Sequence, residues 1–222
     1  MLPRVPEGET RLGRIGRVQA DVQAAFAQAA AADGIVLGPR SFDWLCEQGH
    51  VGLERVAKAR RDPALVGPVT AALEVLAAIH ARLNGDVSVL RASRENLLLP
   101  VNLVHEPTGT VIEVDGAAHF TSVRLATLEL YPADAAVGFD VEEHRQLCVA
   151  WAPRTDGLDR GLAAKGFGFG GLQRERAYHD ALRDLATPAM GHPPLIRIVA
   201  LDDDGAAAYG RHRAALLGRL AA

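Results

Sequence analysis

The sequence predicts a mixed α/β protein whose core follows the order αβββαβ. Residues 17–85 repeat apolar side chains at helical spacing, whereas short β-branched runs follow from Asp86 onward. A later helical pattern leads into a final apolar run, which indicates a helix followed by a strand. With 222 residues, 49% of them hydrophobic, the chain is long enough to bury a sizeable core.

The first 85 residues are predicted to be an arm followed by helices. Residues 1–16 interleave prolines and glycines with arginines, which predicts a mobile arm. Residues 17–85 then form a helical N-terminal region, because apolar side chains recur every three or four positions. The segments expected to be helical are 17–32, 42–48, 51–61 and 68–83.

Residues 86–222 are predicted to form the core domain. Its β-type runs are 87–90, 97–105, 110–115 and 195–201, and its later helices are 172–185 and 206–220. Residues 121–164 are predicted to be a helical insertion, since the segment is longer than a connecting loop requires.

Composition limits the classes of function. A formal net charge of −3 argues against a protein that coats nucleic acid over its whole surface, although a local basic patch can coexist with it. Cys46 and Cys148 are too few for a disulfide framework. The chain shows neither an apolar run near 18 residues nor a charged-then-apolar leader, so we expect a cytoplasmic protein with no membrane partner.

The most informative stretch is TVIEVDGAAHF, residues 110–120. Its β-branched residues predict a short buried strand, so Glu113 and Asp115 share one face with their backbones about 7 Å apart. Two carboxylates this close are hard to keep ionised without a cation or several donors. The stretch is therefore a candidate site. The alternative is a strand that ends in an Asp-Gly turn, with Glu113 paired to an arginine.

The same residues carry a family resemblance. Glu113-Val114-Asp115-Gly116 followed by His119 resembles the metal-site strand of the PD-(D/E)XK nuclease superfamily, in particular its small members related to very-short-patch-repair endonucleases. Asp180, Arg183, Gly191 and the strand Ile196-Arg197-Ile198 fit the later part of the family pattern. On the preceding strand the family has an aspartate where this chain has Asn102.

The resemblance implies a restriction-endonuclease-like fold and metal-dependent cleavage of DNA in defence or repair. It implies Glu113 and Asp115 as ligands of Mg²⁺ or Mn²⁺, with Asn102 offering a neutral oxygen beside them. His119 is the nearest candidate for proton transfer, and capping of the turn is an equal alternative. Arg183 and Arg197 would bind phosphate.

A glycine loop adds further basic candidates. Residues 165–171, KGFGFGG, match G-x-G-x-x-G, but the preceding residues do not form the strand that a dinucleotide site needs. We expect a flexible loop that leads into a helix. Lys165 and Arg176, with Arg174 nearby, are predicted to bind phosphate on the same side as Glu113. A solvated loop and an ion-pair ladder along the helix are the competing interpretations.

Two functions follow from these expectations. The first is a magnesium-dependent nuclease, an enzyme that hydrolyses phosphodiester bonds in DNA. The second is a catalytically inactive nuclease-like module that binds nucleic acid or a protein partner, including a second copy of itself. Convergence of Asn102, Glu113 and Asp115 around an ion-sized gap favours the enzyme, whereas a hydrophobic plug or an arginine in that gap favours the module.

Overall fold

The computed structural model describes residues 11–95, 97–159 and 161–221, and these fold around one four-stranded mixed sheet. The strands are β1 (Leu37–Gly38), β2 (Leu103–His105), β3 (Thr110–Asp115) and β4 (Ile196–Val199). Their order in the sheet is β1-β2-β3-β4, and only β3 and β4 run parallel. The predicted α/β class is confirmed.

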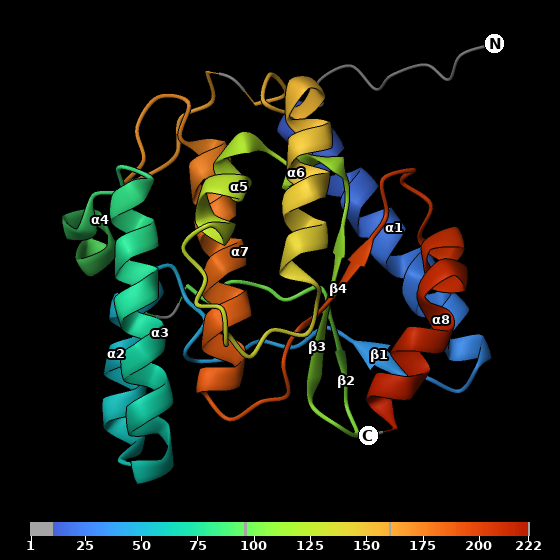
Figure 1. Ribbon diagram of the computed structural model, residues 1–222, viewed down its shortest axis with the longest axis horizontal. Coiled ribbons are helices and arrows are strands. Elements are labelled where there is room, and N and C mark those ends of the chain that lie inside the picture. Colours follow the sequence, from blue (N-terminus) through green and yellow to red (C-terminus); the bar gives the residue numbers. More distant parts are fainter. Residues whose placement is uncertain (1–10, 96, 160, 222) are drawn as a thin grey trace.

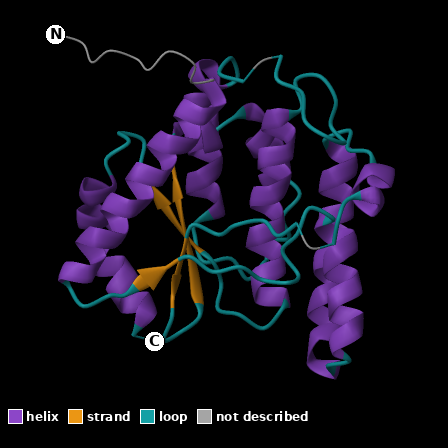
Figure 2. Ribbon diagram, turned by 180° about the vertical axis from the view of Figure 1, so that it is seen from behind, coloured by secondary structure: helices purple, strands orange, loops and turns teal. Residues whose placement is uncertain are grey.

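Helices cover both faces of this sheet (Figure 1). They are α1 (Arg11–Ala32), α2 (Gly49–Arg60), α3 (Pro63–Arg82), α4 (Val87–Ala92), α5 (Ser122–Leu128), α6 (Val141–Thr155), α7 (Leu172–Ala189) and α8 (Gly205–Leu220), with a short 3-10 helix η1 at Ala117–His119. α1 and α8 cover one face, α5, α6 and α7 cover the other, and α2, α3 and α4 lie beyond α7. Figure 2 shows the strands from behind, between the same two layers.

The alternation of side chains along β3 and β4 decides what each face buries. Ile112 and Val114 of β3, with Ile196 and Ile198 of β4, belong to the apolar cluster under α1 and α8. The other positions of these strands point toward α5, α6 and α7. They include the acidic residues singled out in the sequence, so strand parity separates a dry face from a charged one.

The strand predicted at 87–90 is wrong. This segment is helix α4, because the Asp86 side chain accepts a hydrogen bond from the Ser88 backbone N–H at 2.9 Å and caps the first turn. The first strand of the sheet is instead β1, which pairs antiparallel with β2. The predicted boundary at Asp86 therefore does not separate the N-terminal region from the sheet.

Other boundaries in the first half of the chain also differ from the prediction. Residues 42–48 form turns rather than a helix, and β2 is shorter than the predicted 97–105. Residues 11–16 of the predicted arm belong to α1, which packs against α8 at the opposite end of the chain. Residues 1–10 of that arm lie outside the described residues.

The second half of the chain follows the prediction closely. β3 spans the predicted 110–115, and the insertion contains α5 and α6. Thr121 starts α5 by accepting from the Arg124 N–H, and Asp140 starts α6 in the same way, accepting from Glu142 and Glu143. α7, β4 and α8 then follow in the predicted order.

Among the described residues one helix, α3, is long and apolar enough by length and composition to cross a membrane. Core helices pass the same test, and α3 packs against α7 with Leu76 and Ile79 fully buried. A cytoplasmic location stays a prediction.

Candidate functional site

The candidate site lies where β3 ends. Glu113 and Asp115 point to the face under α5, α6 and α7, since Glu113 Oε1 lies 3.7 Å from Arg183 Nε of α7 and Asp115 Oδ2 lies 3.8 Å from His144 Nε2 of α6. Their exposed fractions are 2% and 1%. Carboxylates buried this deeply need donors or a cation. The structure supplies donors for both, from different directions.

Arg197 is the principal partner of Asp115. Its Nη1 donates to both Asp115 oxygens at 2.9 and 2.8 Å, and its Nε donates to Asp184 at 2.8 Å. Its Nη2 lies 3.4 Å from Asp180 Oδ1. The pairing follows from the parallel register, which sets Arg197 beside Glu113 on the face that Asp115 also shares. One buried guanidinium thus holds three carboxylates.

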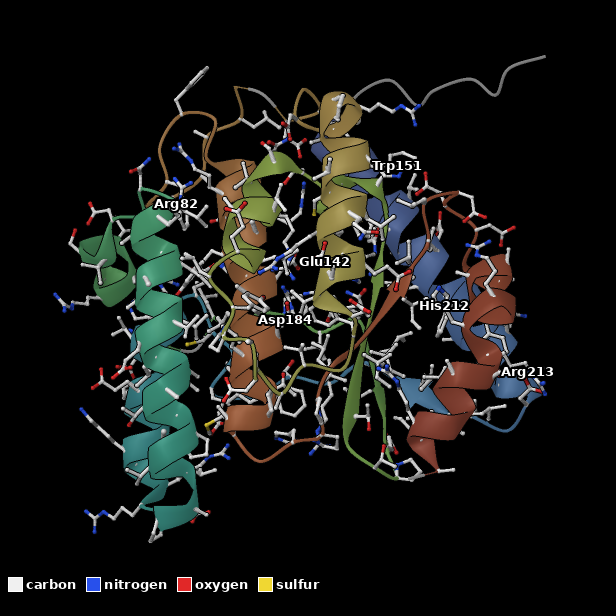
Figure 3. All side chains as sticks on the ribbon, in the orientation of Figure 1. Arg82, Glu142, Trp151, Asp184, His212 and Arg213 are labelled. Carbon is white, nitrogen blue, oxygen red and sulfur yellow. The ribbon has the colours of Figure 1, made fainter. Side chains whose placement is uncertain are left out.

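Asp184 extends this network into the helical layer, and Figure 3 labels it on α7 in the middle of the molecule. Arg124 of α5 donates to Asp184 at 2.5 Å, and the Tyr131 hydroxyl donates to the same oxygen at 2.6 Å. We call Asp115, Asp180, Asp184, Arg124 and Arg197 the buried ion-pair cluster; each is at most 5% exposed. Burial lowers the attraction of Arg197 for its proton, but Asp115 and Asp184 outweigh burial and raise its pKa well above the ordinary value.

His119 lies at the edge of this cluster. Its Nδ1 is 2.9 Å from Asp180 Oδ2 and 3.6 Å from Asp115 Oδ1. Burial alone would lower the pKa of His119, but the two carboxylates outweigh burial and raise it. Burial likewise opposes ionisation of Asp115 and Asp180, yet Arg197 and His119 hold both pKa values below the ordinary range.

Glu113 has a different environment. Its Oε1 accepts from the Asn102 backbone N–H at 3.0 Å and lies 3.7 Å from Arg183 Nε. Arg183 donates to the Pro100 carbonyl from Nε and Nη2, at 3.3 and 2.8 Å, so it is only partly committed to Glu113. Burial therefore dominates and raises the pKa of Glu113, although Arg183 and Arg197 oppose the shift.

A cleft of about 250 Å³ opens beside Glu113, His119 and Asp180. Its lining residues are Gln19, Asn102, Glu113, His119, Leu172, Glu175, Arg176, His179, Asp180 and Arg183. Its lining carries charges of both signs, with Glu113, Glu175 and Asp180 beside Arg176 and Arg183. Asp180 Oδ1 is buried there without a hydrogen-bond partner among the described residues.

The predicted metal ligands do not fit a metal. Both Asp115 oxygens accept from Arg197, whose guanidinium fills the space beside them. Asn102 does not turn its side-chain oxygen toward the carboxylates, because Oδ1 accepts from the Val114 backbone N–H at 2.9 Å. Within residues 11–95, 97–159 and 161–221, no three His, Cys, Asp or Glu side chains are arranged to hold an ion. In this part of the chain, Asn102, Glu113 and Asp115 thus do not converge around an ion-sized gap.

Of the four residues predicted to bind phosphate, two line the cleft and two do not. Arg183 and Arg176 line the cleft, where Arg176 also donates to Asp159 at 2.9 Å. Arg197 is 5% exposed and committed to the buried ion-pair cluster, so it cannot meet a phosphate in solution. Lys165 is exposed on the glycine loop but does not line the cleft.

Sequence reasoning missed three members of the site: Arg124, Tyr131 and Asp184. Asp180 and Asp184 are four residues apart on α7, so they share a helix face, and that spacing was available in the sequence. Arg124 and Tyr131 come from the insertion and meet Asp184 only through folding. Nothing local marks them.

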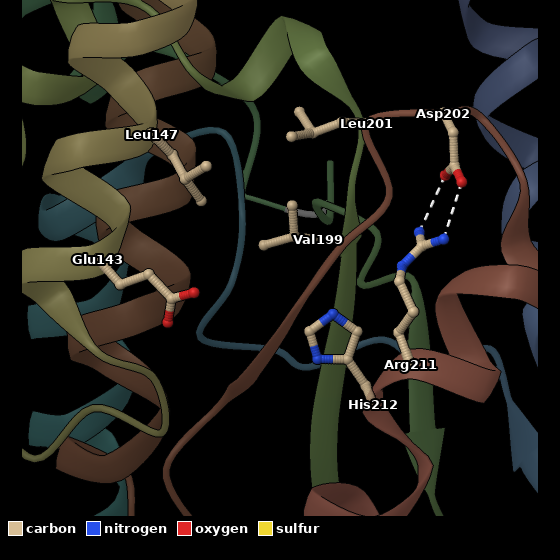
Figure 4. Close-up of a pocket in the computed structure, with 7 residues that line it drawn as sticks. All are labelled: Glu143, Leu147, Val199, Leu201, Asp202, Arg211 and His212. Carbon is tan, nitrogen blue, oxygen red and sulfur yellow. Dashed lines mark hydrogen bonds and ion pairs between the residues drawn. The ribbon is translucent and has the colours of Figure 1, made fainter.

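A second cavity of about 340 Å³ lies between α6, α8 and the end of β4 (Figure 4). Leu147, Val199 and Leu201 form its apolar part. Two of its charged residues neutralise each other, since Arg211 donates to both oxygens of Asp202 at 2.8 and 2.9 Å. None of the predicted site residues lines this cavity.

Comparison of the chain with protein-family models, with curated proteins and with solved structures found no match. The geometry of the site therefore carries the functional interpretation.

Proposed function

We propose that this protein is a nuclease-like module that binds nucleic acid without metal-dependent cleavage. The observation that carries the proposal is the Arg197 guanidinium, bound by both oxygens of Asp115 where the resemblance expects an ion. An ion at Asp115 would have to displace a buried guanidinium from three carboxylates. Displacement would leave that guanidinium without its ion pairs, which is costly in a buried site.

The element order supports the nuclease-like part of the proposal. α1, β1, β2, β3, α7 and β4 give αβββαβ if α2 to α4 and η1 to α6 are taken as insertions. The sheet is mixed, as the resemblance implies. In this proposal β1 is the first strand of the core, in place of the segment 87–90 that the sequence suggested.

The cleft supports nucleic acid as the partner. Arg183 and Arg176 bring two guanidinium groups to an opening where His119 is 19% exposed. Guanidinium groups suit phosphate because they donate in a planar fork. DNA is the partner that the resemblance favours. A protein partner or a second copy of this chain would use the same surface without any dependence on phosphate.

The decisive test is incubation with plasmid, single-stranded DNA and RNA in Mg²⁺ or Mn²⁺, with a chelator as the control. We expect no cleavage and salt-dependent binding, measured by fluorescence anisotropy. Cleavage that the chelator abolishes would instead establish the metal-dependent nuclease. Absence of binding to all three nucleic acids at low salt would remove nucleic acid as the partner.

Two substitutions separate the roles of the acids and the arginines. Asp115→Asn should leave divalent-ion binding, measured by calorimetry, unchanged, because Asp115 pairs with Arg197 rather than with an ion. Arg183→Gln should weaken DNA binding and reduce the slope of affinity against salt by about one unit, the effect of one lost phosphate contact. Arg211→Gln is the matched control, since Arg211 lies at the second cavity.

A further inference from the structure

The glycine loop before α7 holds one aromatic side chain inside and presents another outside. Phe167 is 5% exposed, whereas Phe169 is 80% exposed, the highest value among the large apolar side chains of the described residues. The two rings are two residues apart, with Gly168 between them. Exposure of a whole phenyl ring to water is unfavourable, so a loop that holds it there calls for an explanation.

The loop is built to keep this arrangement. Gly168 and Gly170 have φ values of +67° and +66°, which favour glycine, and a side chain at either position would meet open space. Arg174 from the first turns of α7 donates to the carbonyls of Phe167 and Phe169, at 2.5 and 3.0 Å. Phe167 packs against His80 of α3, with ring centroids 5.3 Å apart. The backbone is thus fixed at both sides of Phe169, while glycines leave its ring uncovered.

The loop leads directly into α7, whose first turns line the cleft. Leu172 lines the cleft and follows Phe169 by three residues, a length of chain that reaches at most about 11 Å. Lys165, in the same loop, is exposed, and the Arg174 guanidinium lies against the Phe169 backbone. The Phe169 ring is therefore flanked along the chain by Lys165 and Arg174, a short length of chain from the cleft that Arg176 and Arg183 line.

We propose that Phe169 stacks on an unpaired base of a nucleic acid whose phosphate lies in the cleft. This inference rests on the proposed function and narrows it to single-stranded DNA or RNA. A base has a flat π-face that matches the ring, and the phosphates on either side of it match Lys165, Arg176 and Arg183. Bases within an intact duplex are covered by their neighbours, so one phenyl ring cannot reach them.

Other partners fit less well. A lipid surface needs a wider apolar face, and the rest of this loop is glycine, lysine and the buried Phe167. An aromatic anchor in a protein interface is surrounded by contacts that exclude water, whereas glycines flank Phe169. Positive charge beside an uncovered ring favours a base.

The test compares wild type, Phe169→Ala and Phe169→Trp for binding to a short single-stranded oligonucleotide and to its duplex. Phe169→Ala should weaken single-strand binding about tenfold, the typical effect of one lost stacking contact, and leave duplex binding and the salt slope unchanged. Phe169→Trp should bind at least as tightly as wild type. An oligonucleotide carrying 2-aminopurine should lose fluorescence on binding wild type but not Phe169→Ala.

The control is Val149→Ala, which trims another exposed apolar side chain, 61% exposed on α6, and should change nothing. If wild type binds neither oligonucleotide at low salt, the proposed function fails and this inference fails with it. If wild type binds and Phe169→Ala binds equally well, only the stacking role is overturned. Loss of binding to anionic lipid vesicles with unchanged oligonucleotide binding would identify Phe169 as a membrane contact and overturn it as well.

Discussion

The face of the sheet under α1 and α8 is apolar, whereas the face under α5, α6 and α7 carries the buried ion-pair cluster. Both faces are built from the same strands, because Ile196 and Ile198 flank Arg197 on β4. The first face gains stability from apolar area removed from water, without directional demands. The second is held by ion pairs with fixed geometry, and a single change there leaves buried charges behind.

The two faces therefore differ in how well they tolerate substitution. On the apolar face, side chains of similar volume can replace one another at modest cost. On the charged face, Arg197 pairs with both Asp115 and Asp184, and Arg124 pairs with Asp184. Replacing any one of these residues therefore removes an ion-pair partner of another. A structural demand of this kind explains buried acids without any catalytic role for them.

The largest effect should come from Arg197→Met. Methionine fills much of the space but leaves Asp115 buried without its principal partner and Asp184 with only Arg124 and Tyr131, which should destabilise the fold by about 3–5 kcal/mol. Ile198→Val, one residue along the same strand on the apolar face, should cost about 0.5–1.5 kcal/mol. Urea unfolding of both variants measures the contrast. Equal losses would show that the ion-pair cluster contributes no more than an ordinary methyl group.

A smaller loss should come from Gly205→Ala, where the apolar face is most closely packed. A Cβ at Gly205 would lie 1.9 Å from the Val22 carbonyl oxygen and 2.7 Å from the Phe26 nitrogen, so α8 and α1 must move apart. Overpacking of this kind costs about 1–3 kcal/mol. Gly210→Ala is the control in the same helix; its Cβ meets nothing within 4 Å and should stabilise the protein by about 0.5–1 kcal/mol. A neutral Gly205→Ala would mean that the two helices are not in close contact.

Much of the second half of the fold could be predicted from the sequence. The β-branched run of β3 and the helical spacing of α7 are local signals, and the structure follows them. The prediction for residues 87–90 is wrong because Val87, Val89 and Leu90 suggest a strand. The helix there begins with a cap supplied by one side chain, that of Asp86. β1 has only two residues and could not be found by periodicity.

The candidate site was predictable only in part. Strand parity correctly set Glu113 and Asp115 on one face, and both are buried there. The partner of Asp115 depends on which strand lies beside β3 and in what register, and no local pattern contains that information. The family resemblance implies that Arg197 binds phosphate, whereas the register of β3 and β4 places its guanidinium against Asp115.

The smallest expected effect is the dependence of folding stability on pH. This dependence has opposite signs for different groups on the charged face. Asp115 and Asp180 have pKa values lowered from 3.8, so their stabilising contribution is present above that pH and is lost as the pH falls through the lowered pKa values. Glu113 and His119 have pKa values raised from 4.5 and 6.5. Their contributions are complete below those ordinary values and are lost as the pH rises through the raised ones.

The combined contribution of these four groups should therefore be largest in mildly acidic solution and decline toward alkaline pH. Glu113→Gln keeps the shape of the side chain and removes its ionisation, so the decline that begins near pH 4.5 should become shallower while the acid limb below pH 3.8 stays in place. His119→Gln should remove the part of the decline that begins near pH 6.5. Urea unfolding midpoints measured across this range provide the comparison. If Glu113→Gln left the decline from pH 4.5 unchanged and made the acid limb shallower, the pKa of Glu113 would be lowered, and its pairing with Arg183 would outweigh its burial.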